Sequence, residues 1–482
     1  MSIMADEARI AAKIRPQGDY GTAVFPVGSG ETGLRLRWRG GGAPPGALVV
    51  LFDPRRGVRL NKWLRPDETP EIGADGASMG GIPGLIDEGQ WEARLFLPLP
   101  AGAGAELLVE FAPQSAGKGG KKICRGGFLD GYDPKKTARN AAGWYKGDFH
   151  THTLLSDGKE TAESATEKAE RMGLDFYVPT EHNVLHTSWP DTRLLIVPGL
   201  EMTSLGGHCN VFGLDAPPEA LYAPRNWRLG FLAPDALKVL LEQCAGCVCS
   251  LNHPFLREWS WRVPDIPLDL FHTLEVVNDP TYPYADDANE NALRLWTRLW
   301  NDGRRIYGVG GSDSHNLEHE RYDQATEPSV PGDPATWVFC EGLCGENLLQ
   351  SVKAGHMYVT RRGLKLELSI LADHKNVLPG DRVSGGARVS FHIASAEAET
   401  AGSCHVQWIV NGETRGTGSL QAAGAEFSIE ADKLEYGWVR ADLRDDDGAF
   451  LGFVNPVYWG SKRPGLTTFG QAASGLAIGG VP

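Results

Sequence analysis

The feature that most constrains the fold of this chain is an alternation of strand-like and helix-like segments that begins near residue 145. Short apolar runs at 175–180, 194–198 and 306–310 alternate with amphipathic stretches at about 162–172 and 233–244. Strands that alternate with helices tend to lie parallel in one sheet, because each helix returns the chain to the same edge. Seven or so strands are enough to close such a sheet into a barrel, which we predict here.

Segments with the pattern of β-strands flank this region on both sides. Residues 34–38 and 91–97 alternate apolar and polar side chains before it, and residues 364–370 do so after it. A period of two is typical of strands with one buried face, and Asn411-Gly412 is a hairpin-turn signal. We predict three domains, namely an N-terminal β-rich domain at 1–140, the barrel at 141–362, and a C-terminal β-rich domain with a Gly-rich tail at 363–482.

Histidine and carboxylate side chains follow the predicted strands of the middle segment. Nine of them fall at the carboxyl end of a strand or in the turn just after it. They are His150, His152, Asp157, His182, Glu201, His208, His253, Asp313 and His315. In a parallel barrel these ends all open onto one face, where active sites form. We therefore expect the nine side chains to converge.

A convergent set of this kind indicates bound cations. Buried carboxylates and imidazoles repel one another or lose hydration unless positive ions neutralise them. His150 and His152 are two residues apart on an extended segment, so both point to the same side and can bind one ion. Asp157 alone would also suit an N-cap of the helix that follows. Nine such residues in register with the strands favour a metal site.

These motifs resemble the ligand set of the PHP (polymerase and histidinol phosphatase) superfamily. The resemblance covers about residues 145–360, and the stretches 199–201 and 207–214 are similar to its CehA/McbA-type metallohydrolase branch. It implies an α/β fold with a distorted (β/α)7 TIM-like barrel, flanked here by β-rich, sandwich-like domains. Glu181 stands before His182 where related sequences commonly have Asp, a conservative change that removes no ligand.

The resemblance also implies how the ligands divide among two or three divalent metal ions. One ion would be held by His150, His152, Glu201 and Asp313. Glu201 would bridge to a second ion, also bound by His208 and His253. A third would take Asp157, His182 and His315. Ligation by His and carboxylate without Cys suits Zn, Mn or Fe, and the sequence does not choose among them.

The expected activity is that of a metal-dependent hydrolase. Two cations that share a water lower its pKa toward neutrality and create a hydroxide nucleophile. We predict that a metal-bridged hydroxide cleaves a small phosphomonoester or phosphodiester, with Glu201 bridging the ions and Asp313 or His315 moving the proton. Two alternatives stay open. One is a carbamate or carboxyl ester hydrolase of the carbaryl-hydrolase type, and the other is a non-catalytic metal-binding scaffold.

The loop after His253 offers candidates for substrate binding. Arg257 and Arg262 flank Trp259 and Trp261 there, on the face where we expect the site. Guanidinium groups can clamp a phosphate and stack on an aromatic group. A surface loop in which Arg packs on Trp explains the same pattern, so both interpretations stand.

Charge and composition limit the kinds of partner that the protein can bind. The net charge is −14 over 482 residues, and an acidic surface repels phosphate backbones, so we expect no long nucleic acid. We expect no membrane partner, because no apolar run approaches about 20 residues. The first ten residues lack the apolar stretch of a secretory signal, which predicts a cytoplasmic enzyme acting on a small-molecule ester. The oligomeric state stays open.

Cys244, Cys247 and Cys249 are expected to pack as small apolar residues rather than to bind metal.

Overall fold

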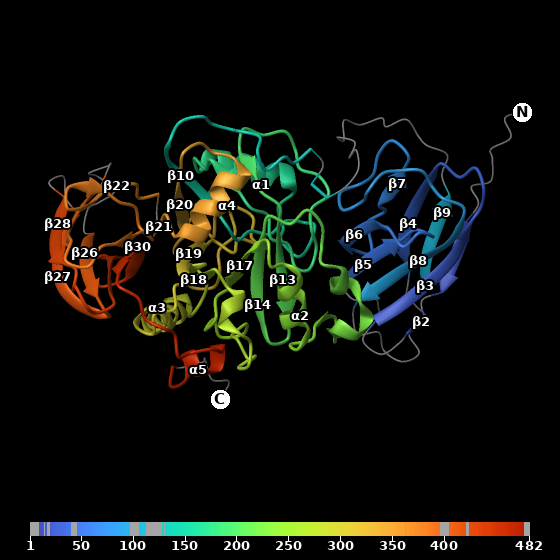
Figure 1. Ribbon diagram of the computed structural model, residues 1–482. Coiled ribbons are helices and arrows are strands. Elements are labelled where there is room, and N and C mark those ends of the chain that lie inside the picture. The colour runs from blue at the N-terminus through green and yellow to red at the C-terminus, as the bar shows by residue number, and fades with distance from the viewer. Residues whose placement is uncertain are drawn as a thin grey trace, which may run out of the picture.

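The computed structural model arranges the chain as a central α/β part between two β-rich parts (Figure 1). It describes residues 9–13, 15–16, 20–39, 46–96, 106–111, 128–129, 131–361, 363–395, 404–420 and 424–476. Whether the predicted domain boundaries mark independent folding units stays a prediction.

Two antiparallel sheets form the N-terminal part. Their strand orders are β1-β9-β4-β7 and β2-β3-β8-β5-β6. Buried side chains such as Phe25, Leu36 and Trp91 form a common apolar core for the two sheets. The strands are β1 (Arg9–Lys13), β2 (Arg15–Pro16), β3 (Tyr20–Val27), β4 (Gly33–Arg39), β5 (Ala47–Phe52), β6 (Val58–Leu64), β7 (Glu71–Gly73), β8 (Gly89–Phe96) and β9 (Glu106–Phe111).

The strands of the central part belong to two sheets. The strands are β10 (Gly143–Asp148), β11 (Phe176–Tyr177), β12 (Leu195–Ile196), β13 (Gly199–Ser204), β14 (Gly207–Phe212), β15 (Trp227–Arg228), β16 (Phe231–Leu232), β17 (Val248–Leu251), β18 (Thr273–Asn278), β19 (Tyr307–Gly311), β20 (Ala335–Cys340) and β21 (Met357–Thr360). One sheet has the order β15-β16-β13-β14-β17-β18-β19, and β12, β11 and β10 begin the other.

Two isolated bridges connect these sheets at the positions where candidate ligands lie. His182 pairs with Glu201 and Thr151 pairs with Ser314, both in parallel orientation. The pairs β17–β18, β18–β19, β10–β11 and β11–β12 are also parallel. β13 and β14 instead form an antiparallel hairpin, because the turn between them is far too short for a crossover helix. The closed barrel stays a prediction.

The helices of the central part are α1 (Ala162–Arg171), α2 (Ala236–Gln243), α3 (Ala285–Asn301) and α4 (Gly345–Ala354), with short 3-10 turns at η1 (Glu219–Tyr222), η2 (Pro224–Asn226) and η3 (Leu268–Leu270). The Thr161 hydroxyl caps α1 by accepting from the Ser164 N–H. Asp157 therefore has no capping role and is left to face the site. None of the helices in the described ranges is long and apolar enough to cross a membrane.

The C-terminal part extends a sheet of the central part. In one sheet the order β10-β20-β21-β30-β29-β26-β27 joins strands of the central part to strands of the C-terminal part. The strands β22, β23, β25 and β28 form a second sheet. The strands are β22 (Leu366–Ala372), β23 (Lys375–Asn376), β24 (Arg382–Val383), β25 (Arg388–Ser395), β26 (His405–Val410), β27 (Glu413–Ser419), β28 (Ala425–Glu430), β29 (Gly437–Arg444) and β30 (Phe450–Trp459). Asn411 and Gly412 form the β26–β27 hairpin turn, both with positive φ, as predicted.

The end of the described chain returns to the central part. Helix α5 (Phe469–Ala473) follows an extended segment and lies beside α3, where the Arg298 guanidinium donates to the Ala472 carbonyl at 2.7 Å (Figure 1). The tail up to residue 476 therefore packs as a strap. Residues 477–482 lie outside the described ranges.

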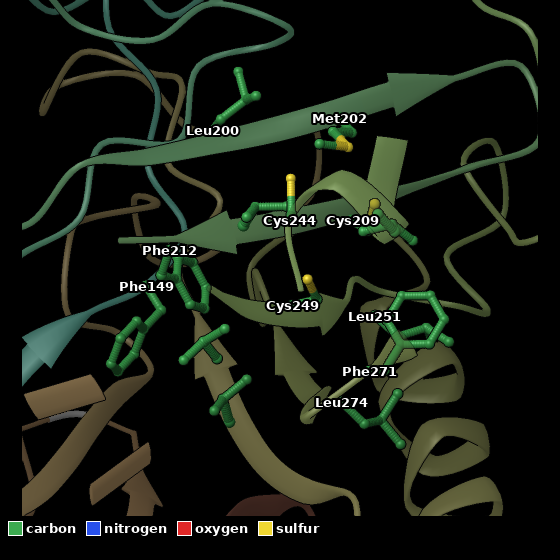
Figure 2. Packing of buried hydrophobic residues seen from close by; sticks show 14 of the residues in the cluster. Phe149, Leu200, Met202, Cys209, Phe212, Cys244, Cys249, Leu251, Phe271 and Leu274 are labelled. Atoms are coloured by element: carbon green, nitrogen blue, oxygen red, sulfur yellow. The ribbon is translucent and has the colours of Figure 1, made fainter. Parts of the chain in front are cut away.

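A large apolar cluster lies between the strands and helices of the central part (Figure 2). Leu200 and Met202 of β13, Phe212 of β14 and Leu251 of β17 are buried in it. Cys209, Cys244 and Cys249 lie among these side chains, and burial raises the pKa of all three thiols. Neutral thiols in an apolar cluster act as small hydrophobic residues, in line with the expectation for the cysteines.

Candidate metal centre

All nine predicted ligands lie together. Seven of them follow a central strand, as predicted. The prediction was wrong for Glu201, which lies within β13, and for His208, which lies near the start of β14, because these two strands form an antiparallel hairpin. His150 and His152 follow β10, and Asp157 lies in the loop after them; His182 follows β11; Glu201 and His208 are in β13 and β14; His253 follows β17; Asp313 and His315 follow β19. The nine residues form four overlapping groups in which ligand atoms lie within 4.8 Å of one another. The groups are His150/His152/Glu201, His150/His253/Asp313, His182/Glu201/His208 and His152/Asp157/His182/His315.

Glu201 is the hub of the cluster. Its side chain is fully buried, and five imidazoles lie near its two oxygens, the farthest being that of His152, whose Nε2 is 3.6 Å from Oε2. The distances to Oε1 are 3.2 Å from His150 Nε2, 3.3 Å from His208 Nδ1 and 3.4 Å from His253 Nε2, and Oε2 lies 2.7 Å from His182 Nδ1. This arrangement suits a carboxylate that bridges two ions.

Asp313 closes the centre from the other side. Its Oδ1 lies 3.2 Å from His150 Nε2 and 3.1 Å from His152 Nε2. The remaining group lies at the rim, where Asp157 Oδ1 is 3.4 Å from both His182 Nε2 and His315 Nε2. The Asp157 side chain is 57% exposed, so this outer group is open to solvent.

Donor atoms without partners show that the cluster fits metal ions. His150 Nε2, His152 Nε2 and Glu201 Oε2 are buried and make no hydrogen bond in the described part of the chain. A buried polar atom without a partner costs roughly 1–3 kcal/mol. These atoms face one another from different strands, and a divalent cation among them would satisfy all of them at once. The cluster can therefore bind metal ions.

In the metal-free protein neighbouring carboxylates favour the protonated forms of His150 and His315. Burial opposes the charged form of His150, but Asp313, Glu275 and Glu201 outweigh burial and raise its pKa well above the usual value. For His315 burial is likewise outweighed, by Asp157 and then Asp313, and its pKa rises to about 9. Metal binding to these imidazoles must displace their protons.

This protonation predicts how the stability of the metal-free protein depends on pH. A histidine whose folded pKa is about 9 and whose unfolded pKa is near 6.5 stabilises the fold fully below pH 6.5, and this contribution is lost as pH rises through 9. We expect the melting temperature of chelator-treated protein to fall between pH 6.5 and 9. His315→Asn should flatten the fall, and metal-loaded protein should show less of it. A melting temperature that rises over this range would contradict the prediction.

A buried carboxylate outside the nine supports two of the ligands. Glu275 Oε1 lies 2.9 Å from His150 Nδ1, and its Oε2 accepts the His253 backbone N–H at 3.0 Å. It comes from β18, a strand from which none of the nine predicted ligands comes. A carboxylate on the far nitrogen of a metal-binding imidazole fixes the tautomer and the ring orientation.

Replacement of Glu275 by Gln should weaken metal binding about 10- to 100-fold, the usual effect of losing such a carboxylate partner. Gln keeps the size but not the charge, so the His150 ring loses its anionic acceptor. Metal affinity measured by competition with a fluorescent chelator checks this. The matched control is Glu367→Gln, which changes an exposed glutamate of β22. Wild-type affinity in Glu275→Gln would show that the contact has no positioning role.

Two further buried carboxylates hold the ligand loops. Glu181 accepts from the backbone N–H groups of Thr153 and Ser156 at 3.0 and 3.1 Å, and it contacts the His186 ring at 2.8 Å. Its side chain fixes the loop that carries Asp157, and its backbone carbonyl accepts the Glu201 backbone N–H at 3.1 Å. Asp148 accepts from the backbone N–H groups of His150, Ser312 and Gly332, which ties the His150 and Asp313 loops together.

The N-terminal β part reaches the same loop. The Trp63 indole donates to the His182 carbonyl at 3.2 Å. The Arg65 guanidinium donates to the carbonyls of Leu154 and Ser156 at 2.7 and 2.9 Å. This part of the chain therefore helps to build the wall of the site.

The two predicted substrate arginines lie in different places. Arg257 stacks over the Tyr284 ring at 4.9 Å, beside the cavity that Glu258 and Tyr282 line. Arg262 lies instead in a separate hollow beside Phe469 of α5. Another aromatic side chain of this loop, Trp259, is 44% exposed, and its ring lies 5.5 Å from that of His208.

Sequence reasoning also missed a buried carboxyl group at the end of β18. Asp279 accepts from the Thr281 hydroxyl at 2.8 Å and is hydrogen-bonded to the Tyr322 hydroxyl. Burial and then Asp313 raise its pKa to about 7. Its φ of +24°, with +23° at His253 and +50° at Asp313, shows that the backbone is strained at three strand ends. Such strain is concentrated at functional sites.

Comparison with known proteins adds little to this geometry. No protein-family model matches the chain, and no curated protein is significantly similar to it. A solved structure described as a "putative metal-dependent phosphoesterase" from Bifidobacterium adolescentis aligns with 39% of this chain and 92% of its own length. The match has 14% identity and a TM-score of 0.26, which is too weak to carry an argument about fold or activity.

Proposed function

We propose that the chain is a metal-dependent hydrolase of the PHP superfamily that cleaves a small phosphomonoester or phosphodiester within a distorted (β/α)7 barrel. One observation carries the proposal: nine His, Asp and Glu side chains from central strands and the loops after them face one another, and several of their buried donor atoms lack any other partner. Two or three divalent ions, Zn, Mn or Fe, would occupy the cluster.

Bound divalent ions would activate a water and polarise the phosphoryl oxygen. The chain's own residues set the geometry for this. The Asn252 amide donates to Glu201 Oε1 at 2.9 Å, which restrains the carboxylate that would hold the ions. Glu275 orients His150 in the same way.

Proton transfer falls to residues at the open side of the centre. His315 is partly exposed, and its Nδ1 contacts the Asp313 backbone carbonyl at 2.7 Å, which leaves Nε2 facing the rim. When the outer group holds no ion, His315 can hold a proton next to an entering substrate. Asp313, deeper in the site, would accept a proton from the attacking water.

A second candidate function is hydrolysis of a carbamate or carboxyl ester. It is favoured by the exposed Trp259 ring next to His208, because an aromatic wall suits an aryl leaving group better than a bare phosphate. The third candidate, a metal-binding scaffold without catalysis, would keep the ligands but show no turnover.

Elemental analysis together with a substrate panel separates the three. Purified protein loaded with Mn or Zn is offered p-nitrophenyl phosphate, bis-p-nitrophenyl phosphate and 1-naphthyl methylcarbamate. The proposal predicts at least two metal ions per chain and phosphoester turnover that a chelator abolishes. Carbamate turnover alone would favour the second candidate. Full activity after complete metal removal would overturn the metal-dependent mechanism.

A further inference from the structure

A basic cavity lies away from the metal centre, where the central part, the C-terminal sheet and the tail meet. Its volume is about 370 Å³, at the small end of ligand pockets. Four cationic side chains line it, and Asp269 is the one acidic side chain among its lining residues. The four are Arg304, Arg305, Arg382 and Lys462. In a chain of net charge −14 this is a local reversal of sign.

The charges in the cavity are only partly neutralised. Arg304 forms a close ion pair with Asp269 and is the only one of the four with a carboxylate partner among the described residues. Arg305 donates to the Tyr458 hydroxyl at 2.6 Å and stacks over its ring, so its charge is not cancelled. Lys462 donates to the Asn301 carbonyl at 2.6 Å, and Arg382 is exposed in β24.

An unpartnered donor points to a ligand in the same place. The Tyr436 hydroxyl, which lines the cavity, is buried and has no hydrogen-bond partner in the described part of the chain. Burial raises the pKa of Tyr436, so the phenol keeps its proton. Its O–H group therefore needs a hydrogen-bond acceptor. The absence of a protein acceptor beside three uncancelled cations favours an oxyanion from outside the chain.

We propose that this cavity is a binding site for a small anion that carries a phosphate group, separate from the metal centre. Arg305, Arg382 and Lys462 supply the charge, and Tyr436 donates a hydrogen bond. The planar guanidinium fork matches the oxygens of a phosphate group, and a phosphate has enough oxygens to accept from both arginines and from the tyrosine. The inference does not depend on the proposed hydrolase activity.

The position of the cavity gives such a ligand a structural consequence. Arg305 belongs to the segment that leads into β19, Arg382 and Tyr436 belong to the C-terminal part, and Lys462 begins the tail. A bound phosphate group would therefore join three segments of the chain. The five residues of β19 lie between the cavity and Asp313. At the usual rise per residue of a strand they span about 17 Å, so one small anion cannot occupy both sites.

The test uses the full chain after complete metal removal, which takes the metal centre out of competition. Equilibrium dialysis with radioactive inorganic phosphate should show saturable binding of one phosphate per chain. Arg382→Gln and Arg305→Gln should each weaken it at least 10-fold, and Tyr436→Phe should weaken it several-fold. Arg388→Gln, an exposed arginine of the neighbouring β25, is the matched control and should bind as the wild type does.

Displacement by glycerol phosphate in the same dialysis identifies the source of the phosphate group. Tighter binding of the ester assigns the cavity to a small phosphorylated metabolite, and tighter binding of the free ion assigns it to inorganic phosphate. His150→Ala should leave phosphate binding unchanged, which separates this site from the metal centre. No saturable binding to the metal-free wild type, or unchanged binding in Arg382→Gln and Tyr436→Phe, would overturn the proposal.

Discussion

Replacing His150 by alanine is expected to lower hydrolytic turnover by about a thousandfold or more and to remove metal from the protein. His150 is fully buried, and its Nε2 lies 3.2 Å from both Glu201 and Asp313. Without the imidazole, two of the metal groups lose a ligand at once, because His150 belongs to both. A catalytic metal is worth several kcal/mol in the transition state, and each 1.36 kcal/mol is tenfold in rate.

Metal content by elemental analysis and kcat/KM on the best substrate of the panel measure this effect. His319→Ala is the matched control, since it removes an exposed histidine four residues from His315. Far-ultraviolet circular dichroism checks that the variant folds, which we expect because the apolar cluster of the central part is unchanged. If His150→Ala kept wild-type metal content and turnover, the proposed centre would be wrong.

Residue spacing was sufficient to predict which side chains meet. The nine candidates were chosen because each falls at a strand end, and strand ends share one face when strands run parallel. The structure brings all nine into one cluster. The positions of His150 and His152 illustrate why: side chains two apart on an extended segment point to the same side, whatever the rest of the fold does.

The individual contacts within the cluster could not be predicted from residue spacing. The resemblance assigned His182 to the outer site alone, yet its Nδ1 also lies 2.7 Å from Glu201, because the chain at His182 pairs directly with the chain at Glu201. Pairing of two short segments through a single bridge leaves no periodic pattern to detect. The same holds for the β13–β14 hairpin, whose alternating apolar residues are typical of strands in either orientation.

Residues that support the ligands could not be predicted at all. Glu275 lies within a strand that otherwise consists of apolar or small residues, and a lone Glu in such a strand has no spacing signal. Trp63 and Arg65 are more than 80 residues from the loops they hold. Such contacts depend on how the N-terminal sheets pack against the central part, which hydrophobic periodicity does not encode. One signal in the sequence does point to close packing here. Gly310 and Gly311 end the buried strand β19, where larger side chains are usual, and two glycines indicate that other groups approach the backbone closely.

Alanine at Gly311 is expected to damage both the fold and the metal centre. A methyl group there would lie 2.3 Å from Glu275 Oε1 and 2.4 Å from His150 Cβ, which is far inside van der Waals contact. Both neighbours are buried and held by other contacts, so neither can yield cheaply. Overpacking of this kind costs about 1–3 kcal/mol, occasionally more. The clash also pushes apart the Glu275–His150 pair, so metal affinity should fall at least as far as in Glu275→Gln.

Gly143→Ala provides the matched comparison, because a methyl group at Gly143 in β10 would meet nothing within 4 Å. Thermal melting and chelator competition on both variants separate the steric effect from the general cost of changing a strand glycine. Gly311→Ala should melt several degrees lower and bind metal at least tenfold more weakly, whereas Gly143→Ala should match the wild type. Equal melting temperatures and metal affinities in the two variants would contradict the prediction. They would show that close packing of β19 against the His150–Glu275 pair does not hold the metal centre in place.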